Sequence, residues 1–279
     1  MPLNTKVLVI ANLLLSLNVF SQDRTFAWTY NTTVLAKGNK DLEAWGTFGT
    51  GRKYFYQGLD TRLELEVGLT DHLQTAFYIN GSHRSFGANM DTLGGIADTS
   101  INGVFNESDF SVSSEWKWKL SDPVANRLGF TLYGELTLGA GWMELEHKFI
   151  FEKVIGKEIF ALNLIGEHEF GSDVKKGKGE MKYEAMEGEV ALGYMHMFKP
   201  GCGLGLEMRD VNEFAEGKNW ENSALMGGPT YFHSGEKYFV IFSVMPQWRN
   251  LKKTDDTPDN LVLNEHEKIS VRLLIGFGL

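Results

Sequence analysis

The sequence predicts an all-β protein: a transmembrane, antiparallel, up-and-down β-barrel of about twelve strands, preceded by a signal peptide. Three observations predict this fold class. Apolar and polar residues alternate with a period of two along most of the chain after residue 22. The polar face carries many Glu, Lys and Arg residues, too many for the filled core of a soluble β-sandwich. Short and long polar connections also alternate along the chain, as in barrels with turns at one end and loops at the other.

The first 21 residues have the features of a secretory signal peptide. One basic residue, Lys6, precedes a mostly apolar run from Val7 to Phe20, and the small Ser21 fits a cleavage site before Gln22. No later run of 18 apolar residues predicts a transmembrane helix. We therefore expect a signal peptide over residues 1–21, an extended periplasmic lead-in over residues 22–40, and an outer-membrane barrel over residues 41–279. The alternative for Phe26 to Val34 is a further strand.

The segment from Leu59 to Gly68 shows the alternation most clearly. Its apolar side chains interleave with Asp60, Arg62 and two glutamates, whereas a helix would mix both kinds around its circumference. Similar strands of about ten residues recur along the chain. Their expected starts are near Leu42, Leu59, Leu73, Ser108, Leu128, Trp142, Ile159, Lys182, Cys202, Asn222, Tyr238 and His266. An even number of strands would place both ends of the barrel on the short-turn side.

The apolar face predicts contact with lipid. Hydrocarbon offers no partner to backbone N–H and C=O groups, so only a closed barrel satisfies strands that are exposed to it. Aromatic residues gather near the predicted turns, where an interfacial girdle would lie: Trp116, Trp118, Phe149, Phe151, Phe160, Phe198, Phe232 and Tyr238. The final strand is apolar at every second position back from Leu279, an ending that resembles the signal read by the barrel-assembly machinery.

Composition and charge exclude several other classes. A formal charge of −9 disfavours a nucleic-acid binder, which needs a positive surface. The single cysteine, Cys202, rules out an intramolecular disulfide framework or a multi-thiolate metal site. A hydrophobic fraction of 43% is too high for a disordered chain. The mean hydropathy of −0.21 looks soluble, but it is what averaging an apolar and a charged face would give.

One segment resembles a known class of proteins. Residues 62–71 read Arg-Leu-Glu-Leu-Glu-Val-Gly-Leu-Thr-Asp, residues 73–78 read Leu-Gln-Thr-Ala-Phe-Tyr, and Leu42-Glu43-Ala44-Trp45 precedes them. These residues are similar to families of uncharacterised Gram-negative outer-membrane β-barrels of porin or transporter type. The resemblance implies a barrel in the outer membrane and a transport role, and it carries no catalytic residue.

Strand parity assigns an excess of acidic residues to the barrel lumen. The expected acids are Asp60, Glu64, Glu66, Glu115, Glu135, Glu144, Glu146, Glu152, Glu167, Glu169, Glu187, Glu189 and Glu207. The expected bases are Arg62, Lys117, Lys119, Lys148, Arg209 and Arg272. Charges on a low-dielectric wall focus the field, so we expect a passive channel for small solutes whose lumen favours cations. Because such a barrel is narrow, the alternative is a non-conducting structural or adhesion barrel bridged by opposite charges.

A lipid-modifying enzyme is a further alternative, because a known outer-membrane phospholipase is also a twelve-stranded barrel that uses Ser, His and Asn. The local candidates Asn80, Ser82 and His83 fit poorly, since Ser82 and His83 point to opposite faces. We expect no enzyme activity, no cofactor and no metal site; His147, His168 and His196 fall mostly on apolar faces without paired spacing.

The expected partners follow from the predicted location. They are outer-membrane lipid and lipopolysaccharide, the barrel-assembly machinery and small-molecule solutes, with no nucleic acid. Lys175, Lys176 and Lys178 lie in a predicted long loop, where lipopolysaccharide phosphates would be within reach.

Overall fold

The computed structural model describes residues 24–87, 103–175, 178–255 and 257–279. Their regular structure consists of twelve antiparallel strands. These are β1 (Lys40–Thr50), β2 (Tyr56–Thr70), β3 (Leu73–Gly87), β4 (Val104–Ser121), β5 (Gly129–Gly139), β6 (Trp142–Ile155), β7 (Glu158–Lys175), β8 (Lys178–Lys199), β9 (Cys202–Ala215), β10 (Asn219–Ser234), β11 (Tyr238–Asn250) and β12 (Ile269–Gly278). No helix in the described residues has the length and apolarity of a membrane span. The predicted signal peptide lies outside the described residues.

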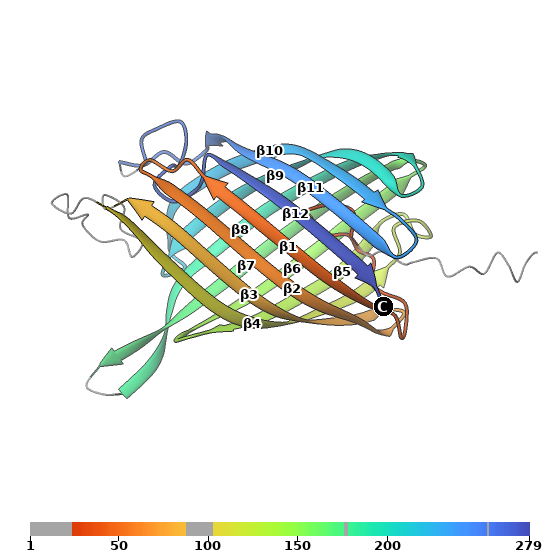
Figure 1. The fold of residues 1–279 in the computed structure, drawn as a ribbon, viewed down its shortest axis with the longest axis horizontal. Coiled ribbons are helices and arrows are strands. Elements are labelled where there is room, and N and C mark those ends of the chain that lie inside the picture. The colour runs from red at the N-terminus through yellow and green to blue at the C-terminus, as the bar shows by residue number, and fades with distance from the viewer. Residues whose placement is uncertain (1–23, 88–102, 176–177, 256) are drawn as a thin grey trace, which may run out of the picture.

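The sheet closes on itself. Each strand pairs with its neighbours in sequence, and β1 pairs with β12 from Asp41↔Gly278 to Thr50↔Ile269. In Figure 1 the barrel lies on its side, with the C-terminus at the right-hand end. Closure leaves no sheet edge with unpaired backbone groups, as a lipid environment requires. The predicted fold class and strand number are confirmed.

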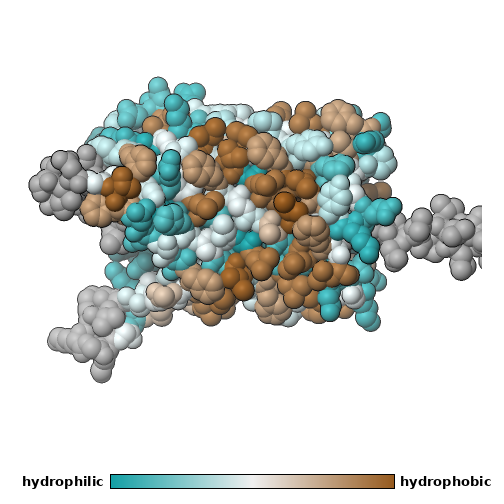
Figure 2. All heavy atoms as spheres, viewed as in Figure 1, coloured by the Kyte–Doolittle hydropathy of each residue, from teal (hydrophilic) through white to brown (hydrophobic). Residues whose placement is uncertain are grey.

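An apolar band surrounds the wall. Figure 2 shows hydrophobic side chains over the middle of the barrel and hydrophilic ones toward both ends. On β3, Phe77 is 56% exposed, whereas its neighbours Ala76 and Tyr78 are 0% and 2% exposed. The outward residues therefore form a lipid-facing surface, and the inward ones fill a lumen.

The predicted aromatic girdle is wrong at Phe232. This side chain is 2% exposed and lies inside the barrel. Its strand, β10, has register shifts between Trp220 and Asn222 on one side and between Leu225 and Met226 on the other. The first shift precedes Asn222, and the second places its additional residue, Trp248, in β11, so parity along β10 is uninterrupted from Asn222 to Phe232. This stretch has no charged side chain on either face, so its pattern does not mark the lumen side. Phe232 faces inward, where it packs in the same apolar cluster as Phe26.

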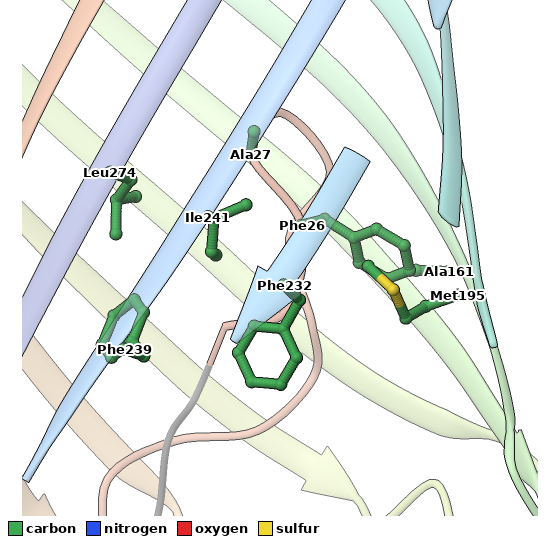
Figure 3. Close-up of a cluster of buried hydrophobic side chains, with 8 residues drawn as sticks. All are labelled: Phe26, Ala27, Ala161, Met195, Phe232, Phe239, Ile241 and Leu274. Carbon is green, nitrogen blue, oxygen red and sulfur yellow. The ribbon is translucent and has the colours of Figure 1, made fainter. Parts of the chain in front are cut away.

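Residues 24–35, here called the plug segment, lie inside the barrel, where the sequence led us to expect a periplasmic lead-in. Phe26 and Ala27 are fully buried and enter a cluster of inward-facing apolar side chains (Figure 3). The wall partners in this cluster are Ala161, Met195, Phe232, Phe239, Ile241 and Leu274. They lie at the short-turn end of β7–β12, and burying Phe26 there removes apolar surface from water in an otherwise charged lumen.

Residues 251–255 and 257–268 lie between β11 and β12 and are here called the inward loop. Val262 is fully buried against Met226 and Met245, and Trp28 of the plug segment packs against the same cluster. The Val262 N–H donates to Gln247 Oε1 at 2.6 Å. The inward loop therefore reaches the plug segment on the β10–β11 side of the lumen.

His266 of the inward loop is half-buried beside acidic and basic groups. Its Nε2 lies 3.2 Å from Asn222 Oδ1 and 3.4 Å from Glu213 Oε1. Burial lowers the pKa of His266 to about 4, and Arg52 acts in the same direction, against the opposing effect of Glu267. A free loop would have an ordinary histidine pKa near ~6.5. The undocked loop therefore binds the extra proton between these two values.

We predict that acidification favours undocking of the inward loop through His266. Its contribution to docking is complete above pH ~6.5 and is lost as the pH falls toward 4. Hydrogen exchange of the loop amides should therefore speed up more steeply between pH 7 and 4.5 in the wild type than in His266→Asn, after correction for intrinsic exchange. Burial raises the pKa of Glu265, so acidification favours docking through this residue. Because Glu265 is present in both proteins, the difference between their pH profiles reports the effect of His266. Identical pH profiles would contradict this assignment.

A second prediction concerns closure of the wall. A Cβ added at Gly205 would lie 2.2 Å from the Tyr194 carbonyl oxygen, whereas one at Gly179 meets nothing within 4 Å. We expect Gly205→Ala to destabilise the barrel by about 1–3 kcal/mol, as overpacking does, and Gly179→Ala to leave it unchanged. Heat-modifiable gel migration in detergent provides the measurement. The closed wild-type barrel should run faster unboiled, and this form should vanish at a lower temperature in Gly205→Ala; co-migration of boiled and unboiled wild type would contradict the fold.

Candidate functional site

Glu207 on β9 holds the plug segment through three backbone groups. Its carboxylate accepts the N–H groups of Ala27 at 3.0 Å, Trp28 at 2.8 Å and Thr29 at 2.7 Å. Hydrogen bonds to an ionised acceptor are about twice as strong as those between neutral groups. One acidic side chain therefore satisfies three successive backbone donors that lack sheet partners.

Glu152 and Asn163 fix the next residues of the plug segment. The Glu152 carboxylate accepts the backbone N–H and the hydroxyl of Thr32, both at 2.7 Å, and the Asn31 amide at 3.0 Å. Asn163 accepts the Tyr30 N–H at 2.6 Å and donates to the Tyr30 carbonyl at 3.0 Å. Wall side chains therefore take the role that a neighbouring strand has in a sheet.

Arginines and tryptophans alternate in a row across the lumen, here called the cation–aromatic stack. The guanidinium of Arg209 lies 4.7 Å from the Trp28 ring centroid, and that of Arg272 lies 3.5 Å from the same ring. Arg272 is also 4.4 Å from the Trp45 ring, which Arg62 approaches at 5.1 Å. Such contacts contribute about 0.5–2 kcal/mol each. The stack joins β9, the plug segment, β12, β1 and β2.

Carboxylates neutralise both ends of this stack. Arg209 makes a bidentate ion pair with Glu189, with Nε 2.8 Å from Oε1 and Nη2 on Oε2. Arg62 reaches Glu135 at 3.2 Å and donates to the Asn80 amide oxygen at 2.7 Å.

Arg272, at the centre of the stack, is partnered differently. Its Nε donates to Thr47 Oγ1 at 2.7 Å, and its Nη1 donates to the Ala27 carbonyl at 3.0 Å. No carboxylate of the described residues forms an ion pair with it. The centre of the stack therefore carries a positive charge held in place by neutral groups.

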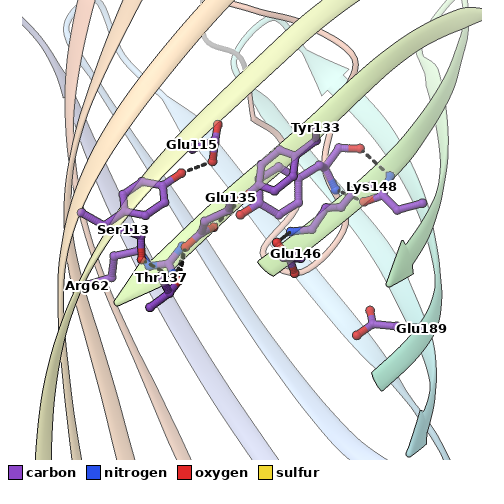
Figure 4. A network of polar contacts seen from close by, with 12 residues as sticks. Arg62, Ser113, Glu115, Tyr133, Glu135, Thr137, Glu146, Lys148 and Glu189 are labelled. Carbon is purple, nitrogen blue, oxygen red and sulfur yellow. Dashed lines mark hydrogen bonds and ion pairs between the residues drawn. The ribbon is translucent and has the colours of Figure 1, made fainter. Parts of the chain in front are cut away.

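The facing wall carries the acidic side chains. Lys148 on β6 pairs with Glu146 at 2.8 Å and lies 3.8 Å from the Tyr30 ring and 4.3 Å from the Tyr133 ring. Figure 4 shows this pair beside Glu135, whose carboxylate accepts the Tyr133 hydroxyl at 2.5 Å. Tyr30 thus anchors the plug segment to this wall as Trp28 does to the arginines.

Directly paired positions on six successive strands form a row of carboxylates. From β4 to β9 these are Glu115, Glu135, Glu146, Glu167, Glu187 and Glu213. Like charges on opposed positions destabilise a sheet, so this row is unfavourable for the wall itself. It makes β4–β9 the acidic side of the lumen.

Between these walls, the described residues enclose two adjoining cavities. An outer cavity of about 320 Å³ is lined by Arg84, Asp109 and Trp142 among others. An inner chamber of about 160 Å³ is lined by residues of the stack and by Glu144, Glu146, Glu167 and Ile165. Trp45, Arg62 and Glu144 line both, so the two cavities adjoin.

The predicted lumen residues take different positions along the barrel. Buried ones are Glu64, Glu66, Glu115, Lys117, Glu135, Lys148, Glu152, Glu189 and Glu207. Arg62, Glu144, Glu146, Glu167, Glu187, Arg209 and Arg272 are half-buried, and Lys119 is half-buried near the β4–β5 turn. Asp60 pairs with Arg84 at 2.6 Å in the outer cavity, and Glu169 is exposed. That they line a path for solutes stays a prediction.

Sequence reasoning missed two groups of lumen residues. Asp41 and Glu43 of β1 are buried, at 2% and 0% exposed, although strand parity could have assigned both. Trp28 and Tyr30 were not predicted to lie in the lumen, because an irregular segment has no periodic pattern that indicates its entry into a barrel.

The enzyme candidates do not assemble. Asn80 accepts a hydrogen bond from Arg62, and its amide nitrogen donates one to the Ser113 hydroxyl at 2.8 Å. His83 is exposed and meets Ser108 at 2.9 Å, so its partner is not Ser82.

The candidate cation ligands are carboxylates rather than histidines. Glu144, Glu167 and Glu169 have oxygens within 4.8 Å of one another, as do three acids on β1 and β2. His147 and His168 stack on each other with centroids 5.5 Å apart. Lys176, one of the lysines expected near lipopolysaccharide, lies outside the described residues.

Solved structures share this fold at low sequence identity. A COG4313 outer membrane channel from Pseudomonas putida F1 aligns with TM-score 0.62 and 13% identity, over 89% of this chain and 98% of that one. The NanC porin aligns with TM-score 0.52 and 11% identity, over 85% and 100%. The translocator domain of autotransporter NalP from Neisseria meningitidis aligns with TM-score 0.55 and 8% identity, over 98% and 95%. The predicted outer-membrane location agrees with this shared fold.

No curated protein matches the chain in sequence. One family does: DUF6662, described as a family of unknown function, matches residues 18–147 and 163–279. Together these ranges cover most of the sequence, and they agree with the resemblance to uncharacterised outer-membrane barrels. The chain belongs to the DUF6662 family.

Proposed function

We propose that the protein is a passive outer-membrane channel for small solutes, with a net acidic lumen that favours cations and with the plug segment as its closing element. The observation that carries this proposal is the plug itself. It occupies the lumen as irregular chain held by side chains, and the polar cavities lie beside it. Two structural neighbours, an outer membrane channel and a porin, support the same class.

The plug segment can leave without breaking the wall. Its attachments to Glu207, Glu152 and Asn163 are hydrogen bonds, and none is part of a strand ladder. Each such bond to a charged group contributes about 1.5–3 kcal/mol, and water can replace it once the segment moves. Local opening below the free energy of global unfolding is therefore accessible.

The charge distribution supports cation preference. A single row of six glutamates follows β4 to β9. Arg62 and Lys148 pair with two of its members, Glu135 and Glu146, whereas Arg209 pairs with Glu189 outside the row, so the row retains an excess of negative charge. The low dielectric of wall and lipid concentrates this field in the lumen and raises the local cation concentration.

Two further classes remain as alternatives to a channel. A non-conducting structural or adhesion barrel would keep the plug segment in place under all conditions, and a lipid-modifying enzyme would hydrolyse or transfer acyl groups. Contacts with lipopolysaccharide and recognition by the barrel-assembly machinery belong to all three proposals. Conductance is therefore the property that discriminates between them.

We predict cation-selective current through the protein in planar bilayers. Under a KCl gradient the reversal potential should correspond to K⁺ being more permeant than Cl⁻, because the acidic row attracts cations. The preference should weaken toward 1 M salt, where the Debye length falls to ~3 Å. Anion preference would contradict the proposed selectivity. An absence of current in both the wild type and a plug-released variant would contradict the channel.

Glu207→Ala is the plug-released variant. It removes the acceptor of three N–H groups, and we expect the open fraction to rise by at least ~10-fold, since about 1.4 kcal/mol corresponds to a factor of ten. Single-channel recording measures this fraction. Glu221→Ala, an exposed glutamate at the loop end of β10, is the matched control and should behave as wild type. Equal open fractions for all three proteins would show that the segment does not close the channel.

A further inference from the structure

We propose that the inner chamber is a binding site for a small zwitterion, whose carboxylate pairs with Arg272 and whose ammonium group lies between Glu144 and Glu167. This inference rests on the proposed channel function, since it names the solute class that the channel would admit. It is carried by a cavity whose other charged residues form ion pairs with one another, namely Arg62 with Glu135, Lys148 with Glu146 and Arg209 with Glu189. Arg272 from β12 and Glu144 and Glu167 from β6 and β7 remain outside these pairs.

Arg272 supplies the positive side. Thr47 and Ala27 occupy its Nε and Nη1, while Nη2 makes no hydrogen bond to a described residue. Its contacts with the Trp28 and Trp45 rings, at 3.5 Å and 4.4 Å, fix the orientation of the guanidinium. An oriented guanidinium with a donor to spare is suited to bind a carboxylate.

Glu144 and Glu167 supply the negative side. They extend from β6 and β7, and oxygens of both lie within one 4.8 Å group that also includes Glu169. Neither Glu144 nor Glu167 has a hydrogen bond or ion pair with the described residues. Two close carboxylates repel each other, and an ammonium group between them would relieve this repulsion.

The size of the chamber limits the ligand. Its 160 Å³ corresponds to about five water molecules at ~30 Å³ each, and the adjoining outer cavity adds about 320 Å³. Ile165 and the rings of Trp28 and Trp45 give it apolar patches between the charged groups. The inner chamber alone has room for an amino acid or a short ω-amino acid, and it is too small for a nucleotide or an oligosaccharide.

Both charges of the ligand are needed. A simple cation would be attracted to Glu144 and Glu167 but repelled by the adjacent Arg272, and a simple anion would experience the reverse. Only a molecule with both groups satisfies the two sides at once. This requirement distinguishes the proposed site from the general cation preference of the lumen.

Isothermal titration calorimetry on the full-length barrel in detergent tests the proposal. The probes are the zwitterions glycine, 4-aminobutanoate and 6-aminohexanoate, together with butanoate and butylammonium as matched single-charge compounds. We expect at least one zwitterion to bind ~10-fold or more tightly than both single-charge compounds. Butylammonium or butanoate binding as tightly as the best zwitterion, or no binding of any probe, would overturn the proposal.

Variants on both sides of the chamber assign the two contacts. The double variant Glu144→Gln, Glu167→Gln should lower the affinity for the best zwitterion by ~10-fold or more. Its affinity for butanoate should be unchanged or higher. Arg272→Gln should also lower the affinity for this zwitterion, although this variant loses a hydrogen bond to the plug segment as well. The binding change in the double variant is therefore the deciding result, because neither glutamate forms a hydrogen bond or ion pair with the described residues of that segment. Glu221→Gln is the control, and a zwitterion affinity unchanged by the double variant would overturn the assignment.

The same preparations separate this inference from the channel proposal. Planar-bilayer recording reports conductance, and calorimetry reports binding without any need for transport. Zwitterion binding without conductance, even in Glu207→Ala, would retain the site and reject the channel. Conductance without zwitterion binding would retain the channel and reject the site.

Discussion

The structure depends on one constraint: a wall in hydrocarbon must pair every backbone N–H and C=O within itself. The pairing of β1 with β12 meets it by removing the last free edge. Once the wall is closed, side-chain parity divides the residues between lipid and lumen, as Phe77 and Tyr78 do on β3. The charged half of the chain therefore faces inward and has to be satisfied inside a narrow barrel.

The same constraint explains how the plug segment is held. An irregular chain brings backbone donors and acceptors into the lumen, and the wall's own groups are already used in the sheet. Wall side chains must supply the partners, which is the role of Glu207, Glu152 and Asn163. Strand parity assigns the two glutamates to the lumen only as negative charges, but they are also the hydrogen-bond acceptors that fix the plug segment. A lumen built only from bases would offer the segment's N–H groups no such acceptors.

Sequence alone predicted whatever is encoded locally. The strand number and the inward positions of Glu64 and Arg209 follow from a period of two, which each strand carries in its own residues. Phe232 was assigned wrongly because the stretch from Asn222 to Phe232 has no charged residue to mark the lumen face, and its inward apolar partner Phe26 is distant in sequence. The plug segment was missed for a related reason: its partners Glu207 and Glu152 lie more than 100 residues away, and no periodic pattern links them to it.

The partnering of Arg272 follows from the plug rather than from a shortage of acids. Carboxylates outnumber bases among the predicted lumen residues, yet this guanidinium lies against Trp28 and donates to the Ala27 carbonyl. The plug segment therefore builds one side of the inner chamber while it closes the barrel. A solute that binds to this arrangement prefers the closed state and stabilises it by linkage, and withdrawal of Trp28 removes part of its binding surface. Opening and release of the solute are thus coupled through the same two residues of the plug segment.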